Sequence, residues 1–107
     1  MSQGKLVRDR IPEIIRADGR EPVTYTADAE EYAARLRAKL QEEVTEFLAS
    51  EDDPEELADI LEVLYALAEH GGTSREQLES LRAAKAEKRG GFASRIIWTG
   101  DRPAGAD

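Results

Sequence analysis

Apolar side chains recur at helical spacing through the middle of the chain. The resulting stripe consists of Leu36, Leu40, Val44 and Phe47. The helix that carries this stripe is expected to begin at Asp28, which Glu31 follows at the spacing of a capping box, and to run to about Ser50. A second helix should be capped by Asp53 and should end at His70, directly before two glycines.

Two further helices are expected outside this pair. Residues 8–19 predict a short helix with Pro12 in its first turn. A third main helix should be capped by Thr73 or Ser74 and should end near Arg89, before another pair of glycines.

The remaining segments are short. The β-branched segments 21–26 and 93–99 predict two short strands near the two ends of the chain. No linker or repeat divides the chain. We therefore expect one domain over residues 1–98 and a flexible C-terminal tail over residues 99–107.

The second helix of the central pair, LADILEVLYALAEH, is apolar around most of its circumference. A helix of this kind is usually buried on several sides. The short turn before it makes it an antiparallel neighbour of the preceding helix. The expected fold is a mainly all-α helical bundle. Three main helices can hardly cover so apolar a helix, and we therefore expect a homodimer or homotetramer.

Composition excludes several classes of site and partner. The chain has 107 residues, no cysteine and a net charge of −8. The lack of cysteine excludes disulfides and thiolate metal sites, and the acidic total argues against binding to a nucleic-acid backbone. No apolar run is long enough for a signal peptide or a membrane span. We expect a cytoplasmic protein with neither nucleic acid nor membrane as a partner.

The negative charge is concentrated in one interval. Between Lys39 and Arg75 the chain carries eleven acidic side chains and no lysine or arginine. Two pairs of these acids are spaced at i, i+3 and lie at the edges of the apolar faces of their helices. The pairs are Glu43 with Glu46 and Glu56 with Asp59. An antiparallel hairpin would bring the pairs face to face, and four such carboxylates cannot all stay ionised without a partner.

A hard divalent cation is the natural partner of such a cluster. Mg²⁺ prefers oxygen ligands and retains water, which suits a site that faces a phosphate. We expect Mg²⁺, with Mn²⁺ as a substitute, because one histidine and no cysteine make zinc or copper a poor fit. Two other interpretations stay open. Acid-rich helices are often solvated faces, and Glu56 stands where a glutamate closes a capping box on Asp53.

Basic side chains gather in the last helix. Arg82, Lys85 and Arg89 share one face of it, with Lys88 beside them. A basic cluster near a metal pocket could hold the phosphates of a polyphosphate, and Lys39 could reach in from the long helix. Basic residues also favour the last turn of any helix through its dipole, so both interpretations stay open.

The segments EEVTE at 42–46 and EELAD at 55–59 resemble the EExxE…ExxD signature of the MazG-like all-α nucleoside triphosphate pyrophosphohydrolases. KLVRDRIPEII near the start and KAEKRGGF near the end resemble a subgroup of small single-domain members, similar to phosphoribosyl-ATP pyrophosphohydrolase. The resemblance runs from residue 4 to about residue 98. It departs in the turn between the motifs, which is short and leaves little room for a base-recognition loop.

The resemblance implies a site and an activity. The implied Mg²⁺ ligands are Glu43, Glu46, Glu56 and Asp59. The reaction would hydrolyse a nucleoside triphosphate, or a related nucleotide polyphosphate, to the monophosphate and pyrophosphate, as in house-cleaning enzymes. Within this cluster, we expect Glu43 or Glu46 to accept a proton from the attacking water, with Glu62 as outer support. The phosphates would be held by Lys39, Lys85, Lys88 and Arg89.

Two rival functions are kept beside this one. The first is the phosphoribosyl-ATP pyrophosphohydrolase reaction itself. The second is a non-catalytic helical interaction module whose acidic hairpin docks a basic partner, with an affinity that falls with salt and ignores Mg²⁺.

Overall fold

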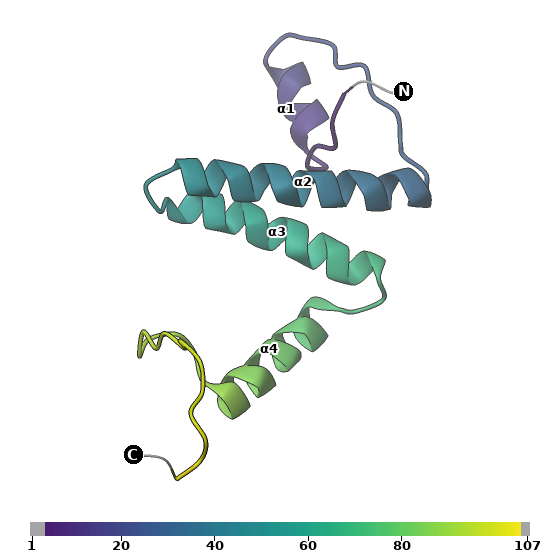
Figure 1. The fold of residues 1–107 in the computed structure, drawn as a ribbon. Coiled ribbons are helices and arrows are strands. Elements are labelled where there is room, and N and C mark those ends of the chain that lie inside the picture. The colour runs from purple at the N-terminus through teal and green to yellow at the C-terminus, as the bar shows by residue number, and fades with distance from the viewer. Residues whose placement is uncertain (1–3, 106–107) are drawn as a thin grey trace.

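The computed structural model describes residues 4–105, and every regular element within them is a helix (Figure 1). The helices are α1 (Ile11–Ala17), α2 (Ala29–Ala49), α3 (Pro54–His70) and α4 (Arg75–Arg89). The predicted all-α class is confirmed, and the three long helices begin and end within about two residues of their predicted limits. Among the described helices, none has the length and apolarity needed to cross a membrane.

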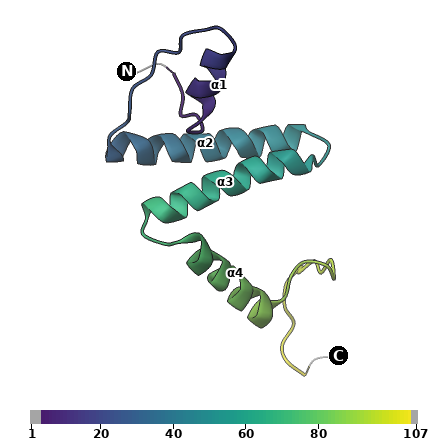
Figure 2. The ribbon, with the colours of Figure 1, turned by 180° about the vertical axis from the view of Figure 1, so that it is seen from behind.

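The two predicted strands are wrong. Neither 21–26 nor 93–99 has strand structure. A strand needs a neighbour that pairs with its backbone N–H and C=O groups. The first segment lies beside α1 and the second lies beyond the end of α4, so the two are at opposite ends of the molecule (Figures 1 and 2). Their β-branched residues favour extended backbone, and no partner strand is at hand to complete a sheet.

Local hydrogen bonds explain where the helices start and stop. The side chain of Asp28 accepts a hydrogen bond of 2.8 Å from the backbone N–H of Glu31, which fixes the start of α2. Asp53 accepts one of 3.0 Å from the N–H of Glu55 at the start of α3. Gly90 ends α4 with a φ of 84°, a backbone conformation that a side chain would resist.

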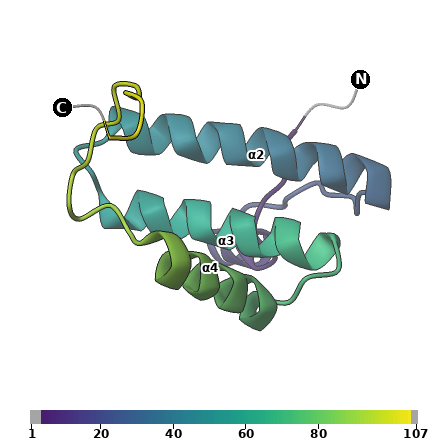
Figure 3. The ribbon, with the colours of Figure 1, turned by 60° about the horizontal axis from the view of Figure 1, so that its bottom comes forward.

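α2 and α3 form an antiparallel hairpin, and α1 and α4 lie on opposite sides of it (Figures 1 and 3). Leu36 of α2 and Val63 of α3 are the buried apolar residues of the described chain. The predicted stripe on α2 is thus only partly covered, since Val44 is 36% exposed. α4 packs against α3 near the turn that joins them and diverges toward its C-terminal end (Figure 1).

The single chain is less compact than a typical globular monomer of the same size. Its solvent-accessible surface is 9526 Å², whereas a compact monomer of this mass exposes about 5,900 Å². Its radius of gyration is 19.6 Å, against about 13 Å for a compact chain of this length. The exposed apolar surface includes Leu57, Leu61 and Leu64 of α3. The oligomer expected from the sequence stays a prediction, and this is the surface that a second copy would cover.

Candidate metal centre

Three of the four predicted metal-binding carboxylates meet between the helices of the hairpin. Glu43 and Glu46 lie one turn apart on α2, and Glu56 lies in the first turn of α3. One carboxylate oxygen of each lies within 4.8 Å of those of the other two. They meet because the antiparallel turn places the end of α2 beside the start of α3 (Figure 1).

Two oxygens of this cluster are buried without a hydrogen-bond partner. Glu43 is the buried charged residue of the described chain, with 7% of its surface exposed. Its Oε2 and the Oε2 of Glu56 accept no hydrogen bond. Withdrawing an ionised carboxylate from water without a new partner costs free energy. A cation or a proton at these oxygens would remove that cost.

One basic side chain reaches the cluster. Nζ of Lys39 lies 3.4 Å from Oε1 of Glu43 and 3.7 Å from Oε1 of Glu42. A single ammonium group cannot neutralise all of the carboxylates around it, so negative charge is left over. The structure thus places Lys39, which the sequence suggested as a phosphate contact, at the edge of the carboxylates.

The carboxylates raise one another's pKa. The negative charge of Glu43 raises the pKa of Glu46, and a hydrogen bond shared by the two carboxyl groups adds to the shift. Burial raises the pKa of Glu56, and the charges of Asp59 and Glu43 act in the same direction. The folded cluster therefore holds protons more tightly than separate carboxylates do. A divalent cation would take the place of those protons.

The donor set fits Mg²⁺ or Mn²⁺. All three residues of the group are glutamates, and no histidine or cysteine joins them in the part of the chain that the structure describes. Three carboxylate ligands would leave positions on such a cation for water and phosphate. The open alternatives fit less well, because a buried Glu43 is not a solvated face. The capping-box interpretation of Glu56 also fits less well. Asp53 caps α3 by accepting a hydrogen bond from the N–H of Glu55, and Oε2 of Glu56 has no hydrogen-bond partner.

Asp59, the fourth predicted ligand, is paired elsewhere. Its Oδ1 accepts a hydrogen bond of 2.6 Å from Nη2 of Arg8, which belongs to the N-terminal segment. Asp59 lies one turn after Glu56, so Arg8 brings a positive charge next to the cluster. Sequence reasoning missed Arg8, because it lies far from Asp59 in the chain and no helical spacing relates the two.

Arg8→Gln is expected to strengthen Mn²⁺ or Mg²⁺ binding about fivefold, because it frees Asp59 to join the other ligands. An exposed ion pair contributes at most about 1 kcal/mol, which corresponds to that factor. Isothermal titration calorimetry measures the change. Arg10→Gln is the matched control, since Arg10 lies in the same segment and pairs with Glu13 instead. Unchanged or weaker binding by Arg8→Gln would contradict a metal-binding role for Asp59.

The basic residues predicted at the end of α4 are not brought to the cluster. Lys85, Lys88 and Arg89 are exposed on a helix that diverges from α3 (Figure 1). Glu62, the predicted outer support, pairs with Arg75 at 3.3 Å. Within one chain, Lys39 and Arg8 are therefore the basic groups next to the carboxylates.

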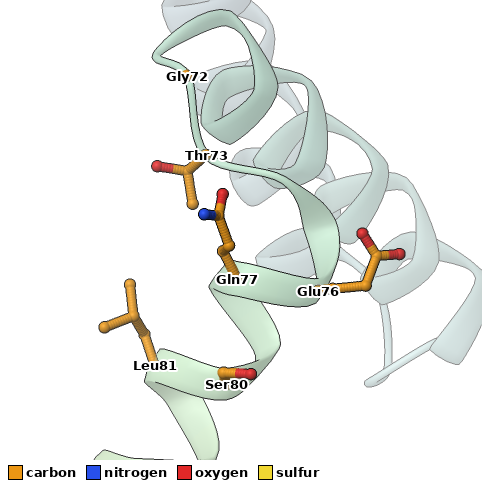
Figure 4. A pocket seen from close by; sticks show the side chains of 6 residues that line it. All are labelled: Gly72, Thr73, Glu76, Gln77, Ser80 and Leu81. Atoms are coloured by element: carbon orange, nitrogen blue, oxygen red, sulfur yellow. The ribbon is translucent and has the colours of Figure 1, made fainter.

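A separate shallow pocket lies beside the turn between α3 and α4 (Figure 4). Its lining residues are Gly72, Thr73, Glu76, Gln77, Ser80 and Leu81. It adjoins the end of α3 that is opposite Glu56, and it contains one carboxylate and no basic side chain. Nothing in this pocket favours a polyphosphate.

Comparisons with known proteins give a partial match of unknown function. No family model and no solved structure matches the chain. An uncharacterised protein of Mycolicibacterium smegmatis is 60% identical over 47 residues, which are 44% of this chain and 48% of the relative. The chain thus spans about half the length of the curated relative that it matches. It is similar, over this stretch, to a bacterial protein whose description states no activity.

Proposed function

We propose that this chain is a Mg²⁺-dependent hydrolase that cleaves a nucleoside triphosphate, or a related nucleotide polyphosphate, to the monophosphate and pyrophosphate. One observation carries the proposal: Glu43, Glu46 and Glu56 meet within 4.8 Å, and two of their buried oxygens lack a hydrogen-bond partner. The resemblance of these residues to the signature of the MazG-like enzymes supports the same chemistry.

Glu43, Glu46 and Glu56 would hold the cation, and Asp59 would join them once Arg8 moves aside. A bound divalent cation supplies polarisation of the phosphate oxygens and a lower pKa for water. Lys39, at the edge of the carboxylates, would exchange its contact with Glu43 for one with a phosphate oxygen.

Glu46 is the best placed of these carboxylates to accept a proton. Hydrolysis joins the water oxygen to the α-phosphorus, breaks the bond between that phosphorus and the bridging oxygen, and releases pyrophosphate. The side chain of Glu46 is exposed to solvent, whereas Glu43 is buried. Water can therefore reach the carboxylate of Glu46, as a group that accepts a proton from an attacking water requires.

A homodimer or homotetramer would complete this arrangement. A second copy packed on α3 would cover Leu57, Leu61 and Leu64, which are 48%, 46% and 37% exposed. It would also bring a second α4, with its basic end, toward the hairpin. The open shape of the single chain supports this part of the proposal.

A nucleotide panel in the presence of Mg²⁺ tests the function. Pyrophosphate release is measured by adding inorganic pyrophosphatase and detecting phosphate with malachite green. The panel holds the ribo- and deoxyribonucleoside triphosphates and phosphoribosyl-ATP. Turnover that EDTA abolishes supports the proposal. Turnover of phosphoribosyl-ATP alone would favour the first rival. No turnover, with salt-sensitive and Mg²⁺-independent binding of a basic peptide, would favour the non-catalytic module.

A further inference from the structure

A cavity of about 800 Å³ separates the N-terminal segment from the hairpin. Its walls are residues 4–9, one side of α1, residues 22–29, the N-terminal half of α2, and His70 at the end of α3. Figures 1 and 3 show that α1 and the segment before it lie on one side of the hairpin and that α4 lies on the other. The volume is within the range of roughly 300–1,000 Å³ that small-molecule sites occupy.

Aromatic rings and apolar side chains line this cavity. The rings of Tyr32 and His70 meet edge to face, with centroids 5.2 Å apart and planes at 88°. Tyr25 also lines the cavity, with 62% of its surface exposed. Ile11 and Ile15 of α1 add apolar surface. Such walls suit a flat ring system, which can stack on an aromatic face.

Polar contacts hold the cavity open and fix its walls. Arg35 of α2 pairs with Glu31 at 3.2 Å and donates a hydrogen bond of 2.8 Å to the carbonyl oxygen of Gly4. The hydroxyl of Tyr25 donates one of 2.5 Å to Glu31. These contacts tie the N-terminal segment and residues 22–29 to α2. The cavity is therefore formed before any ligand arrives, and it offers charged groups that can meet polar ring edges or hydroxyls.

Basic residues connect the cavity with the carboxylate cluster. Arg8 lines the cavity, and its guanidinium group contacts Asp59 at the margin of the cluster. Along α2, Arg35, Lys39 and Glu43 follow at four-residue spacing on one face. The first of these lines the cavity and the last belongs to the cluster, about 12 Å further along the helix. A ligand that spans this path meets aromatic rings, then positive charge, then a carboxylate cluster suited to a cation.

We propose that the cavity binds the nucleoside part of the substrate, and that the phosphates extend past Arg8 and Lys39 to the carboxylates. The inference rests on the proposed function, because it assigns the non-phosphate half of the same substrate. A base-binding cavity in this place would also explain how the chain recognises a base although the turn between its two acidic motifs is short. The recognition surface lies in the N-terminal third of the chain and faces Tyr32 and His70.

Binding of the four common ribonucleoside monophosphates tests this inference without any turnover. Isothermal titration calorimetry is run on the full chain with saturating MgCl₂. Tyr32→Leu is expected to weaken monophosphate binding about tenfold or more, because it removes the stacking ring. Tyr32→Phe keeps the ring and should bind as the unaltered chain does. Tyr65→Leu is the matched control, since Tyr65 lies on α3 with its ring against Arg75 and outside the cavity.

A second variant guards against a folding defect. Tyr25 is exposed, so Tyr25→Ala should keep the helices, and it should weaken binding because the ring and its hydrogen bond to Glu31 are both lost. Circular dichroism and Mn²⁺ titration confirm that each variant keeps its helices and its metal affinity. If Tyr32→Leu and Tyr25→Ala bind monophosphates as the unaltered chain does, the inference is overturned. It is also overturned if Tyr32→Leu lowers the sedimenting mass, because a second copy then fills the cavity.

The two proposals can fail separately. If monophosphate binding depends on Tyr32 but no triphosphate is turned over, the result supports the nucleoside-binding cavity and contradicts the proposed hydrolase activity. If a triphosphate is turned over and Tyr32→Leu leaves its KM unchanged, the result supports the hydrolase activity and contradicts the nucleoside-binding cavity.

Discussion

Glu43→Gln is expected to lower Mg²⁺-dependent hydrolysis by about three orders of magnitude. The amide has the size of the carboxylate but no negative charge, so the cation loses its most buried ligand. Lys39, whose Nζ lies 3.4 Å from Oε1 of Glu43, also loses its charge partner. The quantity to measure is kcat/KM at saturating Mg²⁺, on the best substrate of the nucleotide panel.

Glu51→Gln is the control for this variant. Glu51 lies on the exposed turn between α2 and α3, close to the cluster in sequence but outside the carboxylate group. The same change of charge there should leave kcat/KM unaltered. Circular dichroism shows whether both variants keep their helices. A Glu43→Gln chain that retains kcat/KM within about tenfold would rule out the metal centre as the site of hydrolysis.

Mg²⁺ is expected to raise the melting temperature by about 10 °C at a hundredfold excess over its Kd. Binding to the folded state alone then stabilises it by about 2.7 kcal/mol, and each kcal/mol shifts the melting temperature of a domain of this size by about 4 °C or more. NaCl at the same ionic strength should give a much smaller rise, because it only screens the charges. Differential scanning calorimetry with and without EDTA measures both effects.

Glu56→Gln should abolish the Mg²⁺-specific part of this rise. Without metal, the variant should be as stable as the unaltered chain or more stable, because the carboxylate that it removes is held in a site that raises its pKa. Asp59→Asn should also blunt the response if Asp59 leaves Arg8 for the cation. Equal stabilisation by NaCl and MgCl₂ at matched ionic strength would mean that the carboxylates form an ordinary acidic surface.

Local signals in the sequence were sufficient to place the helices and three of the metal-binding candidates. Asp28 and Asp53 start α2 and α3 through contacts with residues two or three positions later. The i, i+3 spacing of Glu43 and Glu46 then decides which side of α2 they occupy. Because the turn is short, the next helix has to run antiparallel to α2. This places Glu56, in the first turn of α3, beside Glu43 and Glu46.

Features that depend on distant parts of the chain could not be predicted in this way. The pairing of Arg8 with Asp59 and the cavity beside Tyr32 both depend on how the N-terminal segment lies against the hairpin. The direction of α4 also depends on tertiary packing. The basic face of α4, which the sequence suggested as a phosphate-binding surface, therefore lies away from the carboxylates. Strand propensity at 21–26 was overruled because no second strand lies beside it.

The placement of all three cluster carboxylates on one hairpin has a consequence for folding kinetics. Residues this close in sequence meet at a small cost in chain entropy, so the site can assemble while the rest of the chain is still unfolded. Without a cation, repulsion between Glu43, Glu46 and Glu56 opposes closure of the hairpin. A cation bound at this stage would speed folding rather than merely slow unfolding, and stopped-flow refolding with increasing Mg²⁺ would show it as a rising rate. The acidic hairpin would then be the part of the molecule that folds first.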